Sequence, residues 1–207
     1  MELPLLGYAF NNCTNLNNIS LPENLTYIGS YAFVACASLT SISIPSSIAS
    51  IDERTFALCS TLKSIKLSEN VLSIGSGAFN GCESLTSIYI PESVLSIDGN
   101  PFGSCYRLRF TWQFSSKDGK CLIKDGKLIS FCPWTKSPIT YTIPSAVTAI
   151  GAGAFNNCSN LTSVVLPIGL GYIENSAFSS CSSLTEVYSL NINPPSLSDF
   201  IFSNYTA

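Results

Sequence analysis

The sequence predicts a mostly β solenoid in which a coil of 23 residues is repeated along one axis. Each coil carries a phenylalanine, a cysteine three positions later and a leucine three positions after that. The phenylalanines are Phe10, Phe33, Phe56, Phe79, Phe102, Phe155 and Phe178. The step from Phe102 to Phe155 holds one period and a further unit of 30 residues, so one coil is enlarged. Because a single coil of this size cannot bury its apolar side chains alone, stacked copies must share a core. We expect seven or eight coils in one domain spanning residues 1–207.

The first element expected in each coil is a short strand. In the coil that begins at Phe33, residues 39–44 read Leu-Thr-Ser-Ile-Ser-Ile, and this alternation predicts a strand with one buried face. Pro45 ends the strand, because proline cannot donate to the next hydrogen bond of a ladder. A second extended segment then carries Ile48 and Ile51 into the interior.

The second element is a turn formed by the Ala-Phe-x-x-Cys segment, for which we expect a short helical turn. Gly29, Gly75 and Gly151 precede it at one equivalent position, where a tight turn would favour a positive φ. Asp52 and Asp98 occupy that position in other coils, so the turn tolerates more than glycine.

Residues 109–138 are expected to form the enlarged coil, with a hairpin inserted in it. Residues 121–124 and 127–130 alternate in polarity around Asp125-Gly126, the signal for a tight type I′ turn. Basic residues concentrate here, and the predicted basic patch consists of Arg107, Arg109, Lys117, Lys120, Lys124 and Lys127. Beside Trp112 and Trp134 these residues could bind an anionic protein or an acidic glycan. The alternative is that the lysines keep an exposed hairpin edge soluble and unpaired.

Side chains that alternate with buried ones along the strands must point outward, and most of them are Ser or Thr. The larger ones are the candidate ligand-binding residues Tyr89, Phe110, Trp112, Tyr188 and Lys66. Phe110 and Trp112 belong to this surface only if the repeat register holds through the enlarged coil. Residues 108–114 also alternate on their own, and a slip by one residue would send both aromatic side chains inward.

Nine cysteines raise the question of disulfides or a metal site. The chain has neither C-x-x-C clusters nor histidine, so we expect no metal. Seven cysteines recur once per coil with parallel Cβ vectors, which disfavours bridges and predicts a column of buried thiols. Cys121 and Cys132 lie outside that column. They could form a bridge, although direct pairing across the hairpin would place Cys121 opposite Ser130.

Composition limits the function. A net charge of -3 argues against a nucleic-acid partner, and the absence of histidine removes Ser-His-Asp and Cys-His catalysis. The carboxylates Asp52, Glu53 and Asp98 recur with the turns rather than converging, so we expect neither an enzyme nor a cofactor. The uncharged stretch 137–172 is interrupted by prolines and asparagines, which disfavours membrane insertion.

The pattern Phe-x-x-Cys-x-x-Leu-x-x-Ile-x-Ile-Pro resembles the BspA-like leucine-rich repeat family over nearly the whole chain. The resemblance implies an α/β-type solenoid, mostly β, that forms a curved right-handed superhelix with its parallel sheet on the concave face. It also implies an extracellular or cell-surface recognition and adhesion module that binds a protein or glycan partner. We expect a monomer. The alternative is a structural spacer that presents another domain, and the family has no catalytic residues to carry over.

The two ends of the chain depart from the repeat. The first coil begins at its middle, because Leu5 aligns with Ile28 and no strand precedes it, and Pro194-Pro195 breaks the pattern near the other end. Solenoids normally carry polar caps over their terminal coils, and neither end has a clear one. We therefore expect a fragment of a larger protein, with no signal or anchor of its own.

Overall fold

The computed structural model describes residues 3–111 and 114–202, which form a solenoid of about eight coils. Short strands and hydrogen-bonded turns make up every coil, and the described part of the chain has no helix. The short helical turn expected after each second strand is therefore wrong. The described residues therefore contain no helix that is long and apolar enough to cross a membrane.

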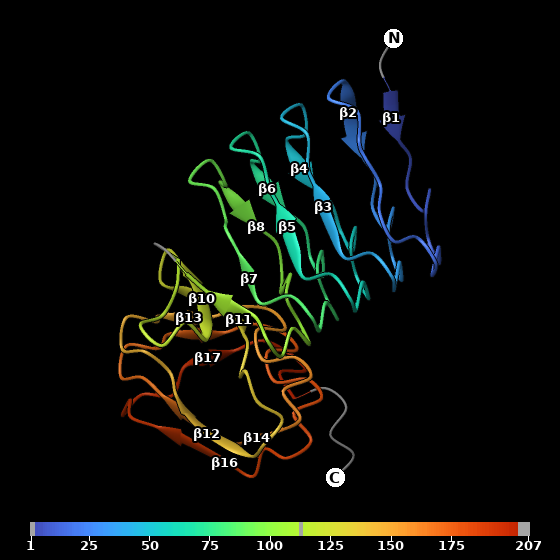
Figure 1. Ribbon diagram of the computed structural model, residues 1–207. Helices are drawn as coiled ribbons and strands as arrows, with labels where there is room; N and C mark the ends of the chain where they lie inside the picture. Colours follow the sequence, from blue (N-terminus) through green and yellow to red (C-terminus); the bar gives the residue numbers. More distant parts are fainter. Residues whose placement is uncertain (1–2, 112–113, 203–207) are drawn as a thin grey trace.

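Most coils contribute a first strand and a second strand to two rows along the solenoid (Figure 1), and the first two coils contribute a second strand alone. The first row consists of β3 (Ser41–Ser43), β5 (Ser64–Lys66), β7 (Ser87–Ile88), β9 (Arg109–Phe110), β12 (Ile139–Thr142), β14 (Leu161–Leu166) and β16 (Glu186–Ser189). The second row consists of β1 (Leu3–Leu5), β2 (Leu25–Ile28), β4 (Ser50–Ile51), β6 (Ser73–Ile74), β8 (Ser96–Ile97), β11 (Lys127–Phe131), β13 (Ala149–Ile150), β15 (Tyr172–Ile173) and β17 (Ser196–Leu197). Neighbouring strands of a row are parallel, and Ile42 is the partner of Ile65. This register confirms the 23-residue period.

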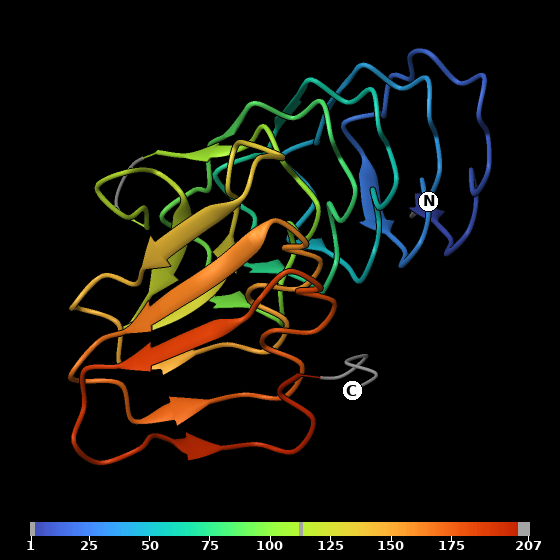
Figure 2. The same cartoon turned by 90° about the horizontal axis from the view of Figure 1, so that it is seen from below.

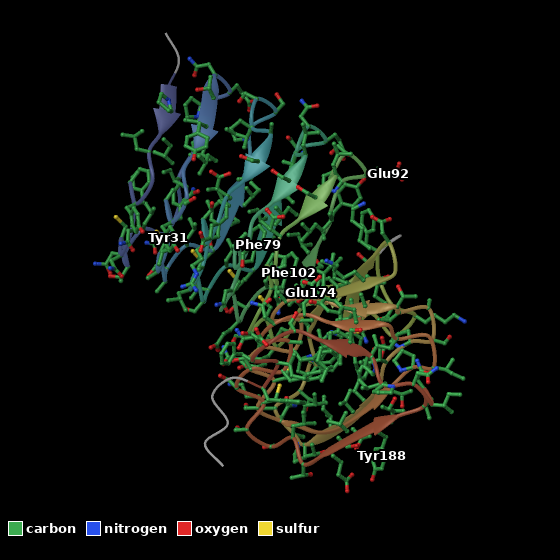
Figure 3. The ribbon with its side chains drawn as sticks, turned by 180° about the vertical axis from the view of Figure 1, so that it is seen from behind. Tyr31, Phe79, Glu92, Phe102, Glu174 and Tyr188 are labelled. Carbon is green, nitrogen blue, oxygen red and sulfur yellow. The ribbon has the colours of Figure 1, made fainter. Side chains whose placement is uncertain are left out.

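The repeated phenylalanines stack inside the solenoid. The rings of Phe33 and Phe56 are nearly parallel, and their centroids are 5.3 Å apart. The rings of Phe79 and Phe102 have the same spacing. All four side chains are fully buried, and Figure 3 labels Phe79 and Phe102. Each ring therefore packs on the ring of the next coil, as the repeat predicts.

The turn around each phenylalanine joins neighbouring coils through its backbone. The N–H of Phe33 donates to the carbonyl of Thr55 in the next coil, whereas the N–H of Ala32 donates to Gly29 within its own turn. The residues two before and two after the phenylalanine have a positive φ in most coils, as Tyr31 and Ala35 do. Two left-handed residues per turn therefore direct alternate amides to the next coil.

The glycines before these turns have a different role from the one predicted. Gly29, Gly75 and Gly151 are not among the residues of positive φ. A Cβ added at Gly75 would lie 2.6 Å from the backbone nitrogen of Glu53 in the preceding coil. Close approach of two backbones, and not φ, is what favours glycine at Gly75.

Both strand rows are interrupted at the same place. β8 does not pair with β11, and β9 does not pair with β12, so the described strands fall into sheets on either side of residues 109–138. We call these residues the joint. Figure 1 shows the coils before the joint in one stack and the coils after it in a second stack at an angle to the first.

A hairpin formed by β10 (Cys121–Lys124) and β11 fills the joint. The turn residues Asp125 and Gly126 have φ values of 52° and 76°, which confirms the predicted tight turn. Cys121 lies opposite Phe131, and Leu122 lies opposite Ser130, because an irregularity follows Leu122. The predicted pairing of Cys121 with Ser130 is therefore wrong by one residue.

Both faces of the hairpin are buried, in two different cores. Leu122, Ile129 and Cys132 belong to the core of the N-terminal half. Cys121, Leu128 and Phe131 belong to the core of the C-terminal half. Alternate side chains of a strand point to opposite faces, so the hairpin acts as a shared wall between the halves. Cys121 and Cys132 lie on opposite sides of that wall, and both are free thiols.

Candidate binding surfaces

The outward side chains of the first strand row in the N-terminal half form the N-terminal strand face. It consists of Ser41, Ser43, Ser64, Lys66, Ser87, Tyr89, Arg109 and Thr111, all of which are exposed. The outward direction of Lys66 and Tyr89 agrees with the prediction, and Tyr89 is 40% exposed. No carboxylate occurs at these positions, so the face is cationic with one large aromatic side chain.

Phe110 does not belong to this face, which corrects the prediction. Arg109 pairs with Ser87 and Phe110 pairs with Ile88, so the register slips by one residue relative to the 23-residue period. The Phe110 side chain is 3% exposed and contacts Phe102 edge-on, with ring centroids 5.5 Å apart. Of the two registers that the sequence left open, the slipped one is correct here. The candidate Trp112 lies outside the described residues.

Trp134, which the sequence analysis placed beside the basic residues, extends the N-terminal strand face. The Arg109 guanidinium lies over the Trp134 ring, 4.0 Å from its centroid. The indole N–H donates to the carbonyl of Leu108, which fixes the ring against the first strand of that coil. Lys120 approaches the same ring at 5.7 Å. Two cations on one partly buried indole make a basic and aromatic surface at the joint.

The predicted basic patch does not stay together. Lys127 forms an ion pair with Glu174 at 2.6 Å, and Lys124 lies 3.3 Å from its neighbour Asp125. The edge of β11 that carries Lys127 pairs with β13, so the alternative interpretation, in which the lysines keep that edge unpaired, does not hold for Lys127. Arg107 and Lys117 are exposed, and neither forms an ion pair with a described carboxylate.

Tyr188 lies in the C-terminal half (Figure 3), whereas Tyr89 follows β7 in the N-terminal half. Tyr188 projects from β16 beside Glu186, and a hydrogen bond to that carboxylate raises the pKa of the Tyr188 hydroxyl. Ser163, on β14 between β12 and β16, is 5% exposed. The two halves therefore present separate surfaces.

Asp52, Glu53 and Asp98 converge more than the sequence suggested. They line one hollow of about 230 Å³, together with Gly75. The Tyr27 hydroxyl donates to Asp52 at 2.6 Å, and this bond raises the Tyr27 pKa. The described residues contain no group of three or more cysteine or acidic side chains arranged to hold a metal ion.

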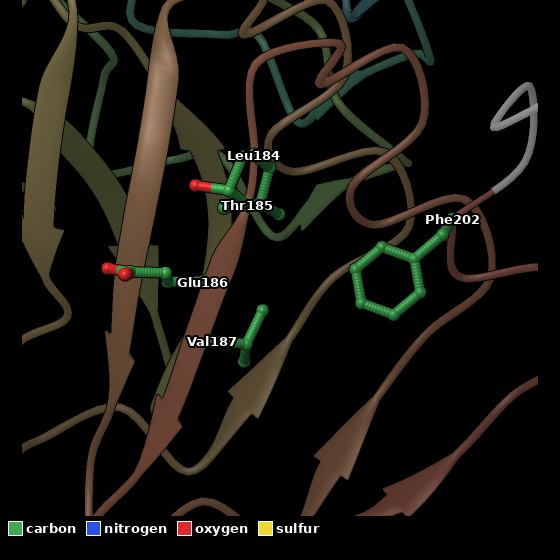
Figure 4. Close-up of a pocket in the computed structure, with 5 residues that line it drawn as sticks. All are labelled: Leu184, Thr185, Glu186, Val187 and Phe202. Carbon is green, nitrogen blue, oxygen red and sulfur yellow. The ribbon is translucent and has the colours of Figure 1, made fainter. Parts of the chain in front are cut away.

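An apolar hollow of about 330 Å³ lies on the last described coil (Figure 4). Leu184, Val187 and Phe202 line it, together with Thr185 and Glu186. Val187 occupies the inward position of its strand but is 44% exposed, since no further described coil covers it. The hollow is thus the open end of the core.

A larger hollow, of about 530 Å³, lies at the joint between the edge of β12 and the loop before the hairpin. We call it the joint groove. Its walls are formed by Ser115, Ser116, Lys117, Asp118 and Ile123 on the loop side and by Tyr141, Thr142, Pro144, Ser145 and Ala146 on the other. Behind the groove surface, the Tyr141 hydroxyl lies 3.1 Å from the Cys121 thiol. Burial raises the pKa of that hydroxyl.

Coils of this length that stack Phe, Leu and Ile columns between two rows of parallel strands define a leucine-rich-repeat protein. The BspA type leucine-rich-repeat region matches the sequence in six copies, over residues 5–109 and 131–207. The chain therefore belongs to the BspA-type leucine-rich-repeat family. The match omits most of the hairpin, and no curated protein matches the sequence.

Solved structures of the same fold come from bacterial proteins. A leucine rich cell surface protein from Faecalibacterium prausnitzii is 28% identical over 90% of this chain and 51% of its own length, with a TM-score of 0.69. A leucine-rich repeat protein from Bacteroides ovatus is 26% identical over 91% of this chain and 64% of its own, with a TM-score of 0.57. The pneumococcal vaccine antigen PcpA, at 21% identity and a TM-score of 0.52, supports the fold alone. The chain spans about half the length of the first of these proteins.

Proposed function

We propose that this chain is a non-catalytic recognition module that binds a protein or glycan partner through its N-terminal strand face. The observation that carries the proposal is the grouping of Lys66, Tyr89 and Arg109 on strands of three successive coils. Aromatic and arginine side chains dominate binding energy at interfaces, and a row of parallel strands holds them in fixed positions. Trp134, stacked under Arg109, enlarges the aromatic area.

A location on the cell surface or outside the cell belongs to the same proposal. It is supported by membership of the family and by the similarity to a leucine rich cell surface protein. Under this proposal the chain is one monomeric domain, the coils wind with a right-handed sense, and the N-terminal strand face lies on the concave side. Adhesion is the role that such a surface would serve.

The test compares two tyrosines of equal exposure. Tyr89, on the N-terminal strand face, is 40% exposed, and Tyr172, on β15 in the second strand row, is 41% exposed. The purified chain is applied to a glycan array and to immobilised extracellular matrix proteins, and each ligand found is re-measured with Tyr89→Ala and Tyr172→Ala. We expect Tyr89→Ala to weaken binding at least tenfold and Tyr172→Ala to leave it unchanged.

The alternative is a structural spacer that presents another domain of a larger surface protein. Absence of binding to every immobilised target would favour the spacer. Equal losses in Tyr89→Ala and Tyr172→Ala would instead reject the N-terminal strand face as the contact surface.

A further inference from the structure

We propose that the joint groove binds an extended acidic peptide, which adds a strand to the free edge of β12. The joint groove would be a second contact surface of the recognition module, so its binding role rests on the proposed function. It depends on three features of the joint: an unpaired strand edge inside the solenoid, a hollow beside that edge, and Lys117 on the wall of the hollow with Lys120 near its base.

The unpaired edge results from the interruption of the first strand row. β12 is the outer strand of the sheet β12-β14-β16, and its other edge pairs with no described strand. Figure 2 shows these three strands side by side, with β12 nearest the N-terminal coils. In an unbroken stack that edge would pair with β9, but the hairpin and its preceding loop separate the two strands.

The backbone direction of β12 follows from its bonds to β14. The amides of Ile139 and Ile143 donate to Asn160 and Val165, on the β14 side. In a parallel ladder, residues of alternate position direct their N–H and C=O groups to opposite sides. Thr140 and Thr142 therefore direct theirs away from β14, toward the side on which Thr142 lines the joint groove, and their side chains are exposed. An edge of this kind is a template for another strand.

The hollow beside the edge has room for an added strand and offers apolar contacts. Its volume is about 530 Å³, and Ile123, Pro144 and Ala146 contribute apolar surface to its walls. Ser116 Oγ donates to Asp118 at 2.5 Å and accepts the amide of Cys121 at 2.9 Å, so the loop wall is held by its own hydrogen bonds. A peptide entering the groove meets a wall that is already ordered.

The charge of the groove selects an acidic peptide. Lys117 lines it, and Lys120 Nζ lies 5.7 Å from the ring centroid of Tyr141 at its base. The one carboxylate of the wall, Asp118, is engaged by Ser116 Oγ, by the amide of Lys120 at 3.1 Å and by the Tyr141 hydroxyl at 3.5 Å. Neither lysine forms an ion pair with a described carboxylate. Glutamates on an added strand would supply the missing negative charge.

The experiment uses a fluorescent ten-residue peptide of alternating valine and glutamate and measures its binding to the full chain by anisotropy. A second peptide of the same sequence carries an N-methyl group on every residue, which removes the amide donors of both edges without changing its charge. We expect the N-methylated peptide to bind at least tenfold more weakly, because strand addition needs those amides. Equal binding of the two peptides would overturn strand addition and leave charge attraction alone.

Matched variants locate the site. Ser145→Trp fills the joint groove, whereas Ser46→Trp places the same bulk at the equivalent position after Pro45 in a distant coil. We expect Ser145→Trp to abolish binding of the Val-Glu peptide and Ser46→Trp to leave it unchanged. Lys117→Glu should weaken binding about tenfold, and Lys66→Glu, on the N-terminal strand face, should have no effect.

The two proposals fail separately. If the peptide does not bind at millimolar concentration, or binds with no loss in Ser145→Trp, the joint groove is not a peptide site, and the Tyr89 test of the N-terminal strand face is unaffected. If dextran sulfate binds and its binding falls in Ser145→Trp while the peptide does not bind, the occupant is an anionic glycan, and strand addition is wrong.

Discussion

Asn100 and Gly153 are joined by a hydrogen bond of 2.7 Å, although 53 residues separate them in the sequence. The Asn100 Nδ2 group donates to the Gly153 carbonyl, and its Oδ1 atom accepts the amide of Phe102 at 3.0 Å. In the preceding coil the amide of Phe79 donates directly to Pro101 in the next turn. For Phe102 the Asn100 side chain takes the place of that carbonyl acceptor, and the same side chain links the two halves.

Removal of this link should destabilise the chain. We expect Asn100→Ala to lower the free energy of unfolding by about 1–3 kcal/mol, because the amide of Phe102 loses its acceptor in a part-buried site. Chemical denaturation measures the change. The control is Asn70→Ala, since Asn70 donates to the Ser46 carbonyl at 2.8 Å on an exposed surface. Equal losses in the two variants would show that Asn100 has no special role at the joint.

The hairpin turn depends on Gly126. Its φ is +76°, and an added Cβ would lie 2.7 Å from Thr148 Oγ1 in the next coil. We expect Gly126→Ala to cost about 1–3 kcal/mol in the free energy of unfolding, from backbone strain and the displaced threonine. Gly169→Ala is the matched control, because nothing lies within 4 Å of its added Cβ. That control should be neutral or slightly stabilising, and a loss as large as in Gly126→Ala would contradict the assignment.

The stacked rings dominate the core of the N-terminal half. Phe79 lies between Phe56 and Phe102, with centroids at 5.7 and 5.3 Å, and is fully buried. Phe79→Ala should lower the free energy of unfolding by about 3–5 kcal/mol. The same truncation at Phe200, which is 79% exposed, should change it by less than about 0.5 kcal/mol. Guanidinium denaturation of both variants compares them, and similar midpoints would argue against a continuous ring stack.

The thiol column makes stability depend on alkaline pH. Burial raises the pKa of Cys36 to about 11 and that of Cys59 to about 12, from 9.0 for a free thiol. Above pH 9 the unfolded chain loses these protons while the folded chain keeps them, so folding stability should fall as pH rises from 9 toward 12. Below pH 9 these groups contribute no pH dependence. Melting temperatures between pH 8 and 10.5 measure the slope.

Single substitutions assign that slope to the thiols. Cys59→Ala should reduce it, because one buried proton is removed from the balance, whereas Cys13→Ala should not, because Cys13 is exposed. A melting temperature that is constant from pH 8 to 10.5 would mean that the thiols are not held in a dry interior.

The repeat could be predicted from the sequence because each column recurs at one spacing. Phe33, Cys36 and Leu39 lie in the interior, as their recurrence predicts. The joint could be recognised from Asp125-Gly126 and the step of 53 residues, but its packing could not. Phe131 takes the place of the column phenylalanine, and its ring lies 4.9 Å from that of Phe155. Phe131 could not be assigned to the phenylalanine column from the sequence, because the residue three positions after it is Trp134 and not cysteine.

The candidate surface was predicted only in part. Lys66 and Tyr89 lie in regular coils, where alternation alone fixes their direction. Phe110 points inward because it pairs with Ile88, one residue fewer than a full period away. Extrapolating the 23-residue period into the enlarged coil could not reveal that slip. The stacking of Arg109 on Trp134 joins residues 25 positions apart through the folded joint. The joint groove likewise depends on a broken strand row, which leaves no mark in local sequence.

Like side chains of successive coils stack into a closed interior on each side of the hairpin. Eight of the nine cysteines are buried there, and Cys13 alone is exposed. Counting the thiols that react with a water-soluble reagent at pH 8, before and after denaturation, tests this directly. We predict one fast-reacting thiol in the native chain, lost in Cys13→Ser, and nine after unfolding. Rapid reaction of several thiols in the native chain, or of Cys59 and Cys82 in particular, would contradict it.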